Sequence, residues 1–392
     1  MKKSYLMLSL AAGLLACGKE TATPPTEEFA FVRLLVNDEQ TTRLTVLSPS
    51  TGKTETLEAA FPKASLYATE SGRYAALVHT SSNKVTTFDS GLELHGDHVD
   101  VKGTSKFGVL TGESAKPTHF KSQGGQLITF NDGDGSMSVA AEADVHTAGA
   151  VFRSLPTGNK AHHGAMARFS TGTYAVTEKD GTASGSLPER VKVIDAAGKT
   201  VHVSTLATGG IHGNASDGKV AVFGSVSGVL VVDPAGGQRL IPYPADFGTA
   251  WLSTIYEAKE TFVGYSSAIG AYEIDLSANT IRPLLESKDL LLVRIDASKR
   301  FLLGLTYGGV LKVVDLNTRK LLREGVILPA VSKEDTQKPT LAATSRYAYV
   351  TQPKQGKVLR ISLSNLSDTR SYNVSATPYQ LAVLGYETDE SH

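Results

Sequence analysis

Short apolar stretches, separated by turns, make up most of the chain. Beyond residue 29, apolar side chains tend to recur at every second position within each stretch, and Gly, Asn, Asp or Ser follow. A period of two predicts half-buried β-strands, and the intervening residues are typical of tight turns. Because no segment shows a sustained helical period, the pattern predicts an all-β protein.

One module of strands and turns recurs along the chain. It contains an apolar strand, a turn with Gly or Ser, a second apolar strand, another turn, and a strand that ends in Asp or Ser. Such modules, spaced about 40–50 residues apart, are typical of four-stranded β-propeller blades. A long insert near residues 180–189 interrupts the third copy. The copies cover residues 66–89, 118–140, 162–195, 211–233, 252–275, 293–315 and 341–362.

The two ends of the chain complete one further blade. Residues 29–57 match a module without its first strand, and residues 377–386 match a first strand without its module. Pairing of these segments closes the ring and removes the exposed sheet edges of an open array. We therefore predict a single eight-bladed β-propeller over residues 29–392. Seven blades remain the alternative if two modules share a blade.

The residues before the propeller predict export and lipid attachment. Residues 1–16 begin with Lys2 and Lys3 and continue with an apolar run that is too short to span a membrane. The sequence "LLAC" ends at Cys17 and resembles a bacterial lipobox, which implies lipidation of this only cysteine. Residues 17–28 then form a flexible tether. We expect a protein anchored in the cell envelope, on the periplasmic side of the outer membrane; a plain signal peptide is the alternative.

Charge and motifs exclude several classes of function. Lys plus Arg and Asp plus Glu both number 39, so the chain lacks the basic excess that nucleic acid or an anionic membrane surface requires. It contains no P-loop, nucleophile elbow or CxxC motif. The segment "FNDGDG" (130–135) lacks the spacing of a calcium loop and predicts a hairpin turn instead.

Three of the ten histidines occupy one position of the module. His119 lies six residues before Gly125, and His212 lies six residues before Gly218. The "HHG" of the third module matches the "IHG" of the fourth, which makes His163 the equivalent of His212. Because the first strand of each blade lines the channel, three imidazoles should meet at one level. Such a set is typical of Zn²⁺ sites with one open position; a water-bridged polar lining is the alternative.

A candidate fourth ligand lies in "ELHGDHVDV" (93–101). His98 is the first choice, because a turn after the outer strand of the first blade would allow it to fold over the channel mouth. His95 and Asp100 are further candidates. Asp100 or Asp97 would otherwise orient a ligand imidazole as a hydrogen-bond acceptor. A solvated turn, with no role in metal binding, is the alternative for the two histidines.

Five motifs between residues 93 and 233, "GDHVD", "GESAKPTHF", "FNDGDGSMSV", "AHHGAMA" and "IHGNA", together resemble the periplasmic zinc metallochaperones of the AztD type. Members of this family are β-propellers that pass zinc to the solute-binding protein of a zinc ABC importer. The chain departs from the family pattern at Asp100, where a histidine is usual, and at Ser225, where a cysteine is usual. The resemblance implies zinc-handling roles for His98, His119, His163 and His212, with His162 as a possible ligand.

The prediction is thus a monomeric, lipid-anchored, non-enzymatic zinc carrier with Zn²⁺ in its channel. On its strand, His162 should point away from His163, and a solvent-facing or hydrogen-bonded side chain is favoured over a metal ligand. A zinc-dependent hydrolase or lyase is the first alternative, for which the 180–189 insert, including Glu189, would supply a general base. A metal-free scaffold lipoprotein is the second.

Overall fold

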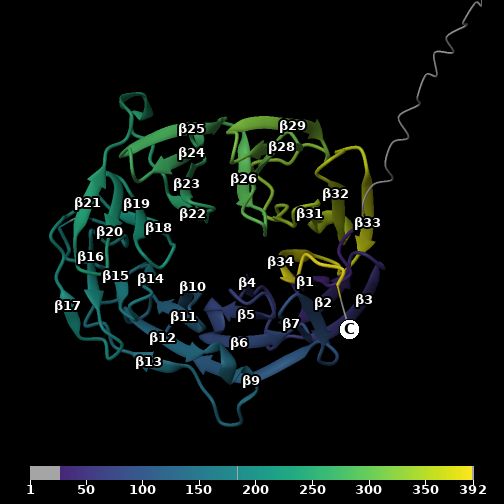
Figure 1. The fold of residues 1–392 in the computed structure, drawn as a ribbon, viewed down its shortest axis with the longest axis horizontal. Coiled ribbons are helices and arrows are strands. Elements are labelled where there is room, and N and C mark those ends of the chain that lie inside the picture. Colours follow the sequence, from purple (N-terminus) through teal and green to yellow (C-terminus); the bar gives the residue numbers. More distant parts are fainter. Residues whose placement is uncertain (1–26, 183, 391–392) are drawn as a thin grey trace, which may run out of the picture.

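The chain forms a ring of eight four-stranded antiparallel sheets around a central channel (Figure 1). The computed structural model describes residues 27–182 and 184–390. The predicted eight-bladed propeller is confirmed. The predicted signal peptide, Cys17 and the tether as far as residue 26 lie outside the described residues. Within the described ranges, no helix is long and apolar enough to cross a membrane.

Seven blades follow one another along the chain, each from the channel outward. The first four are β4 (Ser65–Ala68), β5 (Tyr74–His79), β6 (Lys84–Asp89) and β9 (Lys106–Glu113); β10 (Pro117–Gln123), β11 (Gln126–Asn131), β12 (Ser136–Ala141) and β13 (Arg153–Leu155); β14 (Met166–Arg168), β15 (Tyr174–Glu178), β16 (Arg190–Ile194) and β17 (Thr200–His202); and β18 (Ile211–Ser216), β19 (Ala221–Ser225), β20 (Gly228–Val232) and β21 (Gln238–Ile241). The next three are β22 (Thr254–Ala258), β23 (Thr261–Ser266), β24 (Gly270–Asp275) and β25 (Thr280–Glu286); β26 (Leu290–Ile295), β27 (Phe301–Thr306), β28 (Val310–Asp315) and β29 (Lys320–Val326); and β30 (Leu341–Ala343), β31 (Tyr347–Gln352), β32 (Lys357–Ser362) and β33 (Thr369–Asn373).

Four short 3₁₀ helices lie in the described connections. They are η1 (Thr80–Ser82), η2 (Glu142–His146), η3 (Ala245–Phe247) and η4 (Pro353–Gln355).

The eighth blade joins both ends of the described chain. Its order from the channel outward is β34 (Pro378–Gly385), β1 (Val32–Asp38), β2 (Arg43–Ser48) and β3 (Lys53–Glu58), and Figure 1 shows the yellow β34 beside the purple β1. This confirms the predicted closure. The propeller also begins slightly earlier than predicted, because Glu28 is only 2% exposed and accepts a hydrogen bond from Thr344 Oγ1 at 3.0 Å.

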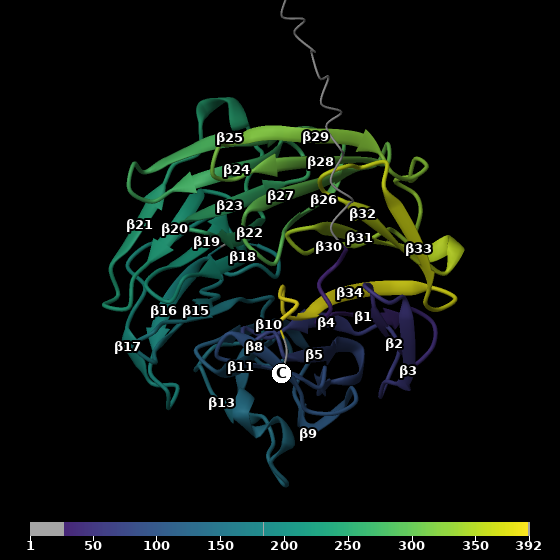
Figure 2. The same cartoon turned by 45° about the vertical axis from the view of Figure 1, so that its right-hand side comes forward.

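An extra hairpin interrupts the first blade. It consists of β7 (Leu92–His95) and β8 (His98–Val101), and it leaves after β6, whereas the outer strand of the blade is β9. The segment 93–101 therefore precedes the outer strand instead of following it, which corrects the position assumed in the sequence analysis. The backbone N–H of Val99 donates to the carbonyl of Glu390 at 3.1 Å. Figure 2 shows the end of the chain beside β8.

Apolar side chains between neighbouring blades hold the inner strands in register. Phe130 of the second blade and Met166 of the third are fully buried in one cluster. Phe169 of the third blade and Phe223 of the fourth are buried in the next. Full burial of a large apolar side chain contributes about 1.5–3 kcal/mol. This packing fixes the second, third and fourth blades relative to one another, and with them the predicted histidine positions.

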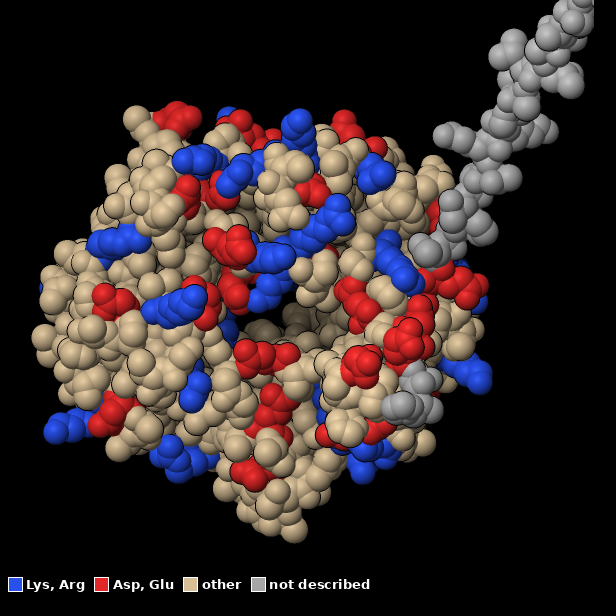
Figure 3. Space-filling model, viewed as in Figure 1, with Lys and Arg blue, Asp and Glu red and all other residues tan. Residues whose placement is uncertain are grey.

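The channel has two different mouths. At the first, which we call the histidine mouth, the inner strands β10, β14 and β18 begin, close to His119, His163 and His212. At the second, the lysine mouth, the same strands end, and there Lys121 and Gln123 line a cavity. The ends of the channel are therefore chemically distinct. Figure 3 shows charged side chains around the hollow at the centre of one face.

The extra hairpin belongs to the lysine mouth. Asp89, at the end of β6, pairs with Tyr74 of β5. The next residue of β5, Ala75, pairs with Ala68 at the end of β4, so β6 and β4 end at the same height along the channel. Ala68 lines the cavity at the lysine mouth. The hairpin that carries His98 therefore leaves the blade at the end of the channel opposite the other three predicted ligands.

Candidate metal centre

His119, His163 and His212 meet in the channel as a cluster that we call the triad. Each contributes a ring nitrogen, and the three nitrogens lie within 4.8 Å of one another. Nε2 of His119 is 3.3 Å from Nε2 of His163. Ring centroids lie 4.9 Å apart for His119 and His163, 5.1 Å for His163 and His212, and 5.9 Å for His119 and His212. The structure thus brings together three residues that are 44 and 49 positions apart in sequence (163 − 119 and 212 − 163).

Local irregularities of the inner strands aim two of these rings. The pairing of β10 with β11 shifts between Pro117 and His119, and that of β18 with β19 shifts between Ile211 and Asn214. A β-bulge or similar irregularity turns the side chains at the end of a strand away from the regular alternation. Each register shift lies at or beside a triad histidine. The irregular start of the strand therefore directs that imidazole toward the channel mouth.

In two of the triad rings, Nδ1 lies next to a protein hydrogen-bond acceptor. Nδ1 of His163 is 2.7 Å from Oδ2 of Asp132, and Nδ1 of His212 is 2.7 Å from the carbonyl oxygen of Ser253. An N–H that donates to these oxygens leaves the lone pair of Nε2 directed at the cluster. Carboxylate and carbonyl acceptors of this kind orient histidine ligands in metal sites and raise their basicity.

Asp132 is a functional residue that the local sequence does not indicate, because "FNDGDG" does not match a calcium loop and predicts only a hairpin turn. The segment does form the turn between β11 and β12, as predicted. Its Asp132 is 8% exposed and faces the next blade. The sequence signal that could have identified Asp132 is an acidic residue directly after the second strand of a blade. That position lies beside the histidine of the neighbouring blade. The acceptors considered instead, Asp97 and Asp100, lie in the extra hairpin.

Burial favours the neutral form of the first triad histidine. It lowers the pKa of His119 to about 3, and the positive charges that His163 and His212 would carry add to the effect. For Asp132, burial alone would raise the pKa, but the hydrogen bonds from His163, Thr118 and Gly164 and the charge of His163 together lower the pKa below its usual value. At neutral pH the site therefore offers at least one unprotonated imidazole beside a carboxylate.

His162 has a different environment from its neighbour. It is 5% exposed; its Nδ1 lies 2.8 Å from the carbonyl oxygen of Lys160, and its Nε2 lies 3.1 Å from the hydroxyl of Thr177. Both ring nitrogens therefore have protein partners, so of the two expected roles the structure agrees with the hydrogen-bonded one and not with the solvent-facing one. Burial also lowers the pKa of His162.

His98 does not join the triad; it forms a second group with His95 and Asp100, which we call the hairpin cluster. Nε2 of His98 lies 3.6 Å from Oδ1 of Asp100, and Nδ1 of His95 lies 3.8 Å from Oδ2 of the same carboxylate. The His95 side chain is 77% exposed and that of His98 is 15% exposed. The placement of His98 as fourth ligand of the channel set is corrected, because the hairpin leaves its blade at the lysine mouth.

The insert of the third blade does not present a free carboxylate. Glu189 is fully buried; its Oε1 is 2.8 Å from Nζ of Lys179, and its Oε2 accepts a hydrogen bond from the backbone of Asp180 at 3.0 Å. A carboxylate that is held in this way is poorly placed to take a proton from a water molecule at the triad.

Fold and site together define a class: eight-bladed β-propellers with three histidines converging in the channel. No family model matches the chain. The curated protein "Zinc chaperone AztD" of Citrobacter koseri is 24% identical over 411 residues, covering 98% of this chain and 94% of that protein. Its crystal structure has a TM-score of 0.83 at 21% identity, with 91% of this chain and 99% of the other covered. The predicted resemblance to AztD is thus confirmed.

A more distant structural match shares the fold alone. The dihydro-heme d1 dehydrogenase NirN has a TM-score of 0.61 at 13% identity and covers 94% of this chain and 77% of its own. Propellers of different function therefore share this architecture, and the function of this chain has to be argued from its site.

Proposed function

We propose that this chain is a zinc metallochaperone that holds Zn²⁺ between His119, His163 and His212 and passes it to a partner. The observation that carries the proposal is the 3.3 Å separation of Nε2 of His119 from Nε2 of His163. Tetrahedral zinc with Zn–N bonds of about 2.0–2.1 Å keeps its nitrogen ligands about 3.3–3.4 Å apart. The name of the similar protein, a zinc chaperone, supports the same choice of metal.

The ligand chemistry suits reversible binding. Neutral imidazoles bind zinc without thiolates, and the hydrogen bonds to Asp132 and Ser253 keep two rings oriented when the metal leaves. Three protein ligands leave one coordination position open. A ligand from a docked partner can occupy that position and begin the transfer.

A carrier role fits the described residues better than hydrolysis. Hydrolysis at a zinc-bound water requires a general base within reach of that water. Asp132 is engaged by His163, and Glu189 by Lys179 and Asp180. Neither carboxylate is poised to act as that base.

The location and the partner are part of the same proposal. The lipobox-like sequence at Cys17 supports a lipid anchor in the cell envelope, and we propose a monomeric propeller on the periplasmic side of the outer membrane. The accepting protein that we propose is the solute-binding protein of a zinc ABC importer. Such a partner needs a zinc site of higher affinity than the triad.

The hairpin cluster is a second candidate zinc site. Two imidazoles and a carboxylate within 4.8 Å form a ligand set that zinc accepts. Because His95 is 77% exposed, this site is open to solvent and would exchange metal more readily than the triad.

Metal titration tests the proposal. We expect the purified protein to bind zinc at the triad, and the variant His119→Ala/His163→Ala/His212→Ala to lose that site. The variant His95→Ala/His98→Ala should lose only the weaker site. Calorimetric titration with zinc alone measures both stoichiometry and affinity. Equal zinc binding by the wild type and the triad variant would refute the assignment.

Two controls complete the experiment. His202→Ala removes a histidine that belongs to neither described cluster and should leave zinc binding unchanged. Zinc-loaded protein mixed with the solute-binding protein should lose its metal to that partner. Turnover of ester or lactone substrates by the loaded protein would favour the hydrolase alternative instead.

A further inference from the structure

On the lysine-mouth side of the triad, the channel contains a cavity whose lining includes charged side chains. On β10, Lys121 and Gln123 follow His119 at alternate positions, so all three point to the channel side of the strand. The cavity has a volume of about 370 Å³ and lies toward the lysine mouth. A cation travelling along the channel between the triad and the lysine mouth would pass through it.

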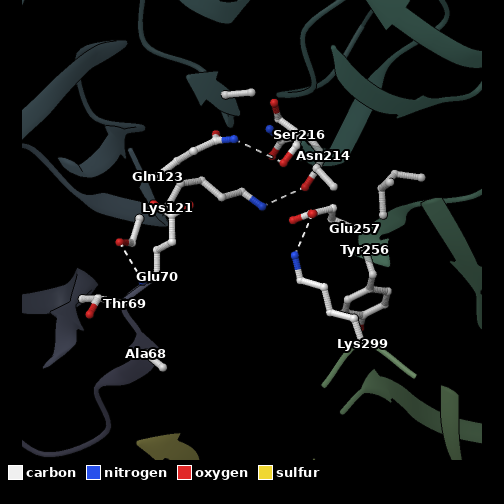
Figure 4. Close-up of a pocket in the computed structure, with 14 residues that line it drawn as sticks. Ala68, Thr69, Glu70, Lys121, Gln123, Asn214, Ser216, Tyr256, Glu257 and Lys299 are labelled. Carbon is white, nitrogen blue, oxygen red and sulfur yellow. Dashed lines mark hydrogen bonds and ion pairs between the residues drawn. The ribbon is translucent and has the colours of Figure 1, made fainter. Parts of the chain in front are cut away.

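Positive side chains enter this stretch from several blades. Nζ of Lys121 donates to the backbone carbonyl of Asn214 at 2.8 Å. Arg294 of the sixth blade donates to the hydroxyl of Tyr256 at 3.1 Å, and Tyr256 lines the same cavity. Neither cation forms an ion pair with a carboxylate among the described residues. Figure 4 shows Lys121 pointing into the cavity from one wall and Tyr256 from the other.

One acidic side chain of the cavity, Glu257, lies between two lysines. Its Oε1 is 2.6 Å from Nζ of Lys299, and Figure 4 shows its carboxylate between the ammonium groups of Lys299 and Lys121. Glu70 is the other acidic residue of the lining, and it lies exposed at the rim. Burial lowers the pKa of Lys121 to about 8, although the charge of Glu257 acts to raise it, so the Lys121 ammonium is still protonated at pH 7. Together with Lys299 and with Arg294 behind Tyr256, it leaves an excess of positive charge over the two carboxylates of the lining.

We propose that metal reaches and leaves the triad through the histidine mouth alone, because Lys121 and Arg294 close the channel to cations on the other side. This inference rests on the proposed zinc site. Repulsion between a divalent cation and fixed positive charges is strong inside a protein, where water screens less than in bulk solvent. Lys121 stands two residues, or about 7 Å along the strand, beyond His119.

Two consequences follow for the route of the metal. Zinc that is bound at the hairpin cluster, at the lysine mouth, does not reach the triad through the channel. A partner that takes zinc from the triad has to dock on the histidine mouth, where Asp132 and the 180–189 insert lie.

Selective obstruction of each mouth tests this route. Replacement of Cys17 by Ser removes the only thiol, so a new cysteine becomes a unique attachment point for a bulky maleimide. Ala68→Cys places the label at the lysine mouth, where Ala68 is exposed and lines the cavity. Ser186→Cys places it at the histidine mouth, because Ser186 is exposed and its carbonyl accepts a hydrogen bond from the backbone of His163 at 3.0 Å.

Stopped-flow mixing with zinc and a fluorescent chelator gives the association and dissociation rates. We expect the label at residue 186 to slow both rates by at least about tenfold, and the label at residue 68 to leave them within about twofold of the unlabelled chain. A slower rate with the label at residue 68, or no effect of either label, would overturn the inference. If the unlabelled chain binds no zinc at the triad, the proposed function itself fails, which is a separate result.

Discussion

A glycine follows two of the triad histidines, and in each case it permits a close contact. Gly213 has a φ of +72°, and a Cβ atom there would lie 2.4 Å from the carbonyl oxygen of Ser253, the same oxygen that holds Nδ1 of His212. A Cβ atom on Gly164 would lie 2.4 Å from the ring of Phe130. The backbone path that positions these two imidazoles therefore requires a glycine at the following residue, because a larger residue would collide with its neighbours.

Gly213→Ala should weaken zinc binding through the displacement of His212. The added methyl group collides with Ser253 and strains a left-handed backbone, so the ring loses its acceptor and moves away from the cluster. We expect a zinc affinity at least about tenfold lower, equivalent to about 1.4 kcal/mol. Gly125→Ala is a matched control, because Gly125 has a φ of +71° with open space around its Cβ position. Equal affinities in the two variants would contradict this role of Gly213.

His79 should make the propeller sensitive to mild acid. Its side chain is 3% exposed and packs against Phe61 with ring centroids 5.5 Å apart, and burial lowers its pKa to about 4 from 6.5. Between these values the unfolded chain binds a proton that the folded chain does not. The free energy of unfolding should therefore fall as the pH drops from 6.5 to 4, by up to about 1.4 kcal/mol per pH unit.

The variant His79→Leu removes this proton uptake. Urea unfolding at several pH values should show a flatter dependence between pH 6.5 and 4 than in the wild type. Parallel curves for the two proteins would show that another group is responsible.

Among the elements, the extra hairpin is attached to the propeller by a narrow base. The backbone N–H of Lys102 donates to the carbonyl of Gly91 at 2.8 Å, and a Cβ atom on Gly91 would lie 2.4 Å from the carbonyl oxygen of Gly103. The two glycines are thus adjacent in space, and a direct link between them would replace the hairpin without stretching the blade.

Excision of residues 92–102 should remove the proposed zinc site of the hairpin cluster and spare the proposed site of the triad. The excised residues include the whole hairpin cluster, whereas the triad lies in other blades. We expect the stoichiometry of zinc binding to fall while the affinity of the triad is unchanged, as measured by calorimetric titration. The free energy of unfolding should fall by a few kcal/mol, because the excision also removes Leu92 and Val99, each 1% exposed, and full burial of such a side chain contributes about 1.5–3 kcal/mol. Loss of triad affinity would show that the hairpin supports that site after all.

The sequence predicted the repeating elements well, and irregular features poorly. Alternation of apolar residues identified the inner strands, and equal spacing to Gly125 and Gly218 aligned His119 with His212. The hairpin at 92–101 was misplaced because its period of two looks like that of any outer strand. The role of Asp132 required knowledge of which loop faces which blade, and this depends on packing between blades that no local pattern encodes.

At the scale of the whole molecule, Asp38 fastens the blade that closes the ring. It is fully buried, and its carboxylate accepts hydrogen bonds from the backbone of Thr377 at 2.7 Å and from the Thr377 hydroxyl at 2.9 Å. Burial alone would raise the pKa of Asp38, but these and neighbouring hydrogen bonds lower it to about 2 from 3.8. The ionised carboxylate therefore stabilises the fold fully above pH 3.8, and this contribution is lost as the pH falls to 2.

Asp38→Asn should destabilise the propeller at neutral pH by about 2 kcal/mol and reduce its loss of stability in acid. Thermal unfolding at pH 7 and near pH 3 measures both effects. Asp134→Asn, in the exposed turn after β11, is a suitable comparison. A variant as stable as the wild type at pH 7 would show that Asp38 does not fasten the closing blade.

Each triad histidine comes from a different blade, so an ion held by all three would act as a staple across them. In the metal-free protein, apolar side chains hold the second, third and fourth blades together. A ligand that binds only the folded arrangement makes local opening of that arrangement rarer. Zinc should therefore slow amide hydrogen exchange in β10, β14 and β18, and leave β26 and β30, across the ring, at their original rates. The cargo would then stiffen one side of its carrier, and its release would restore that side's mobility.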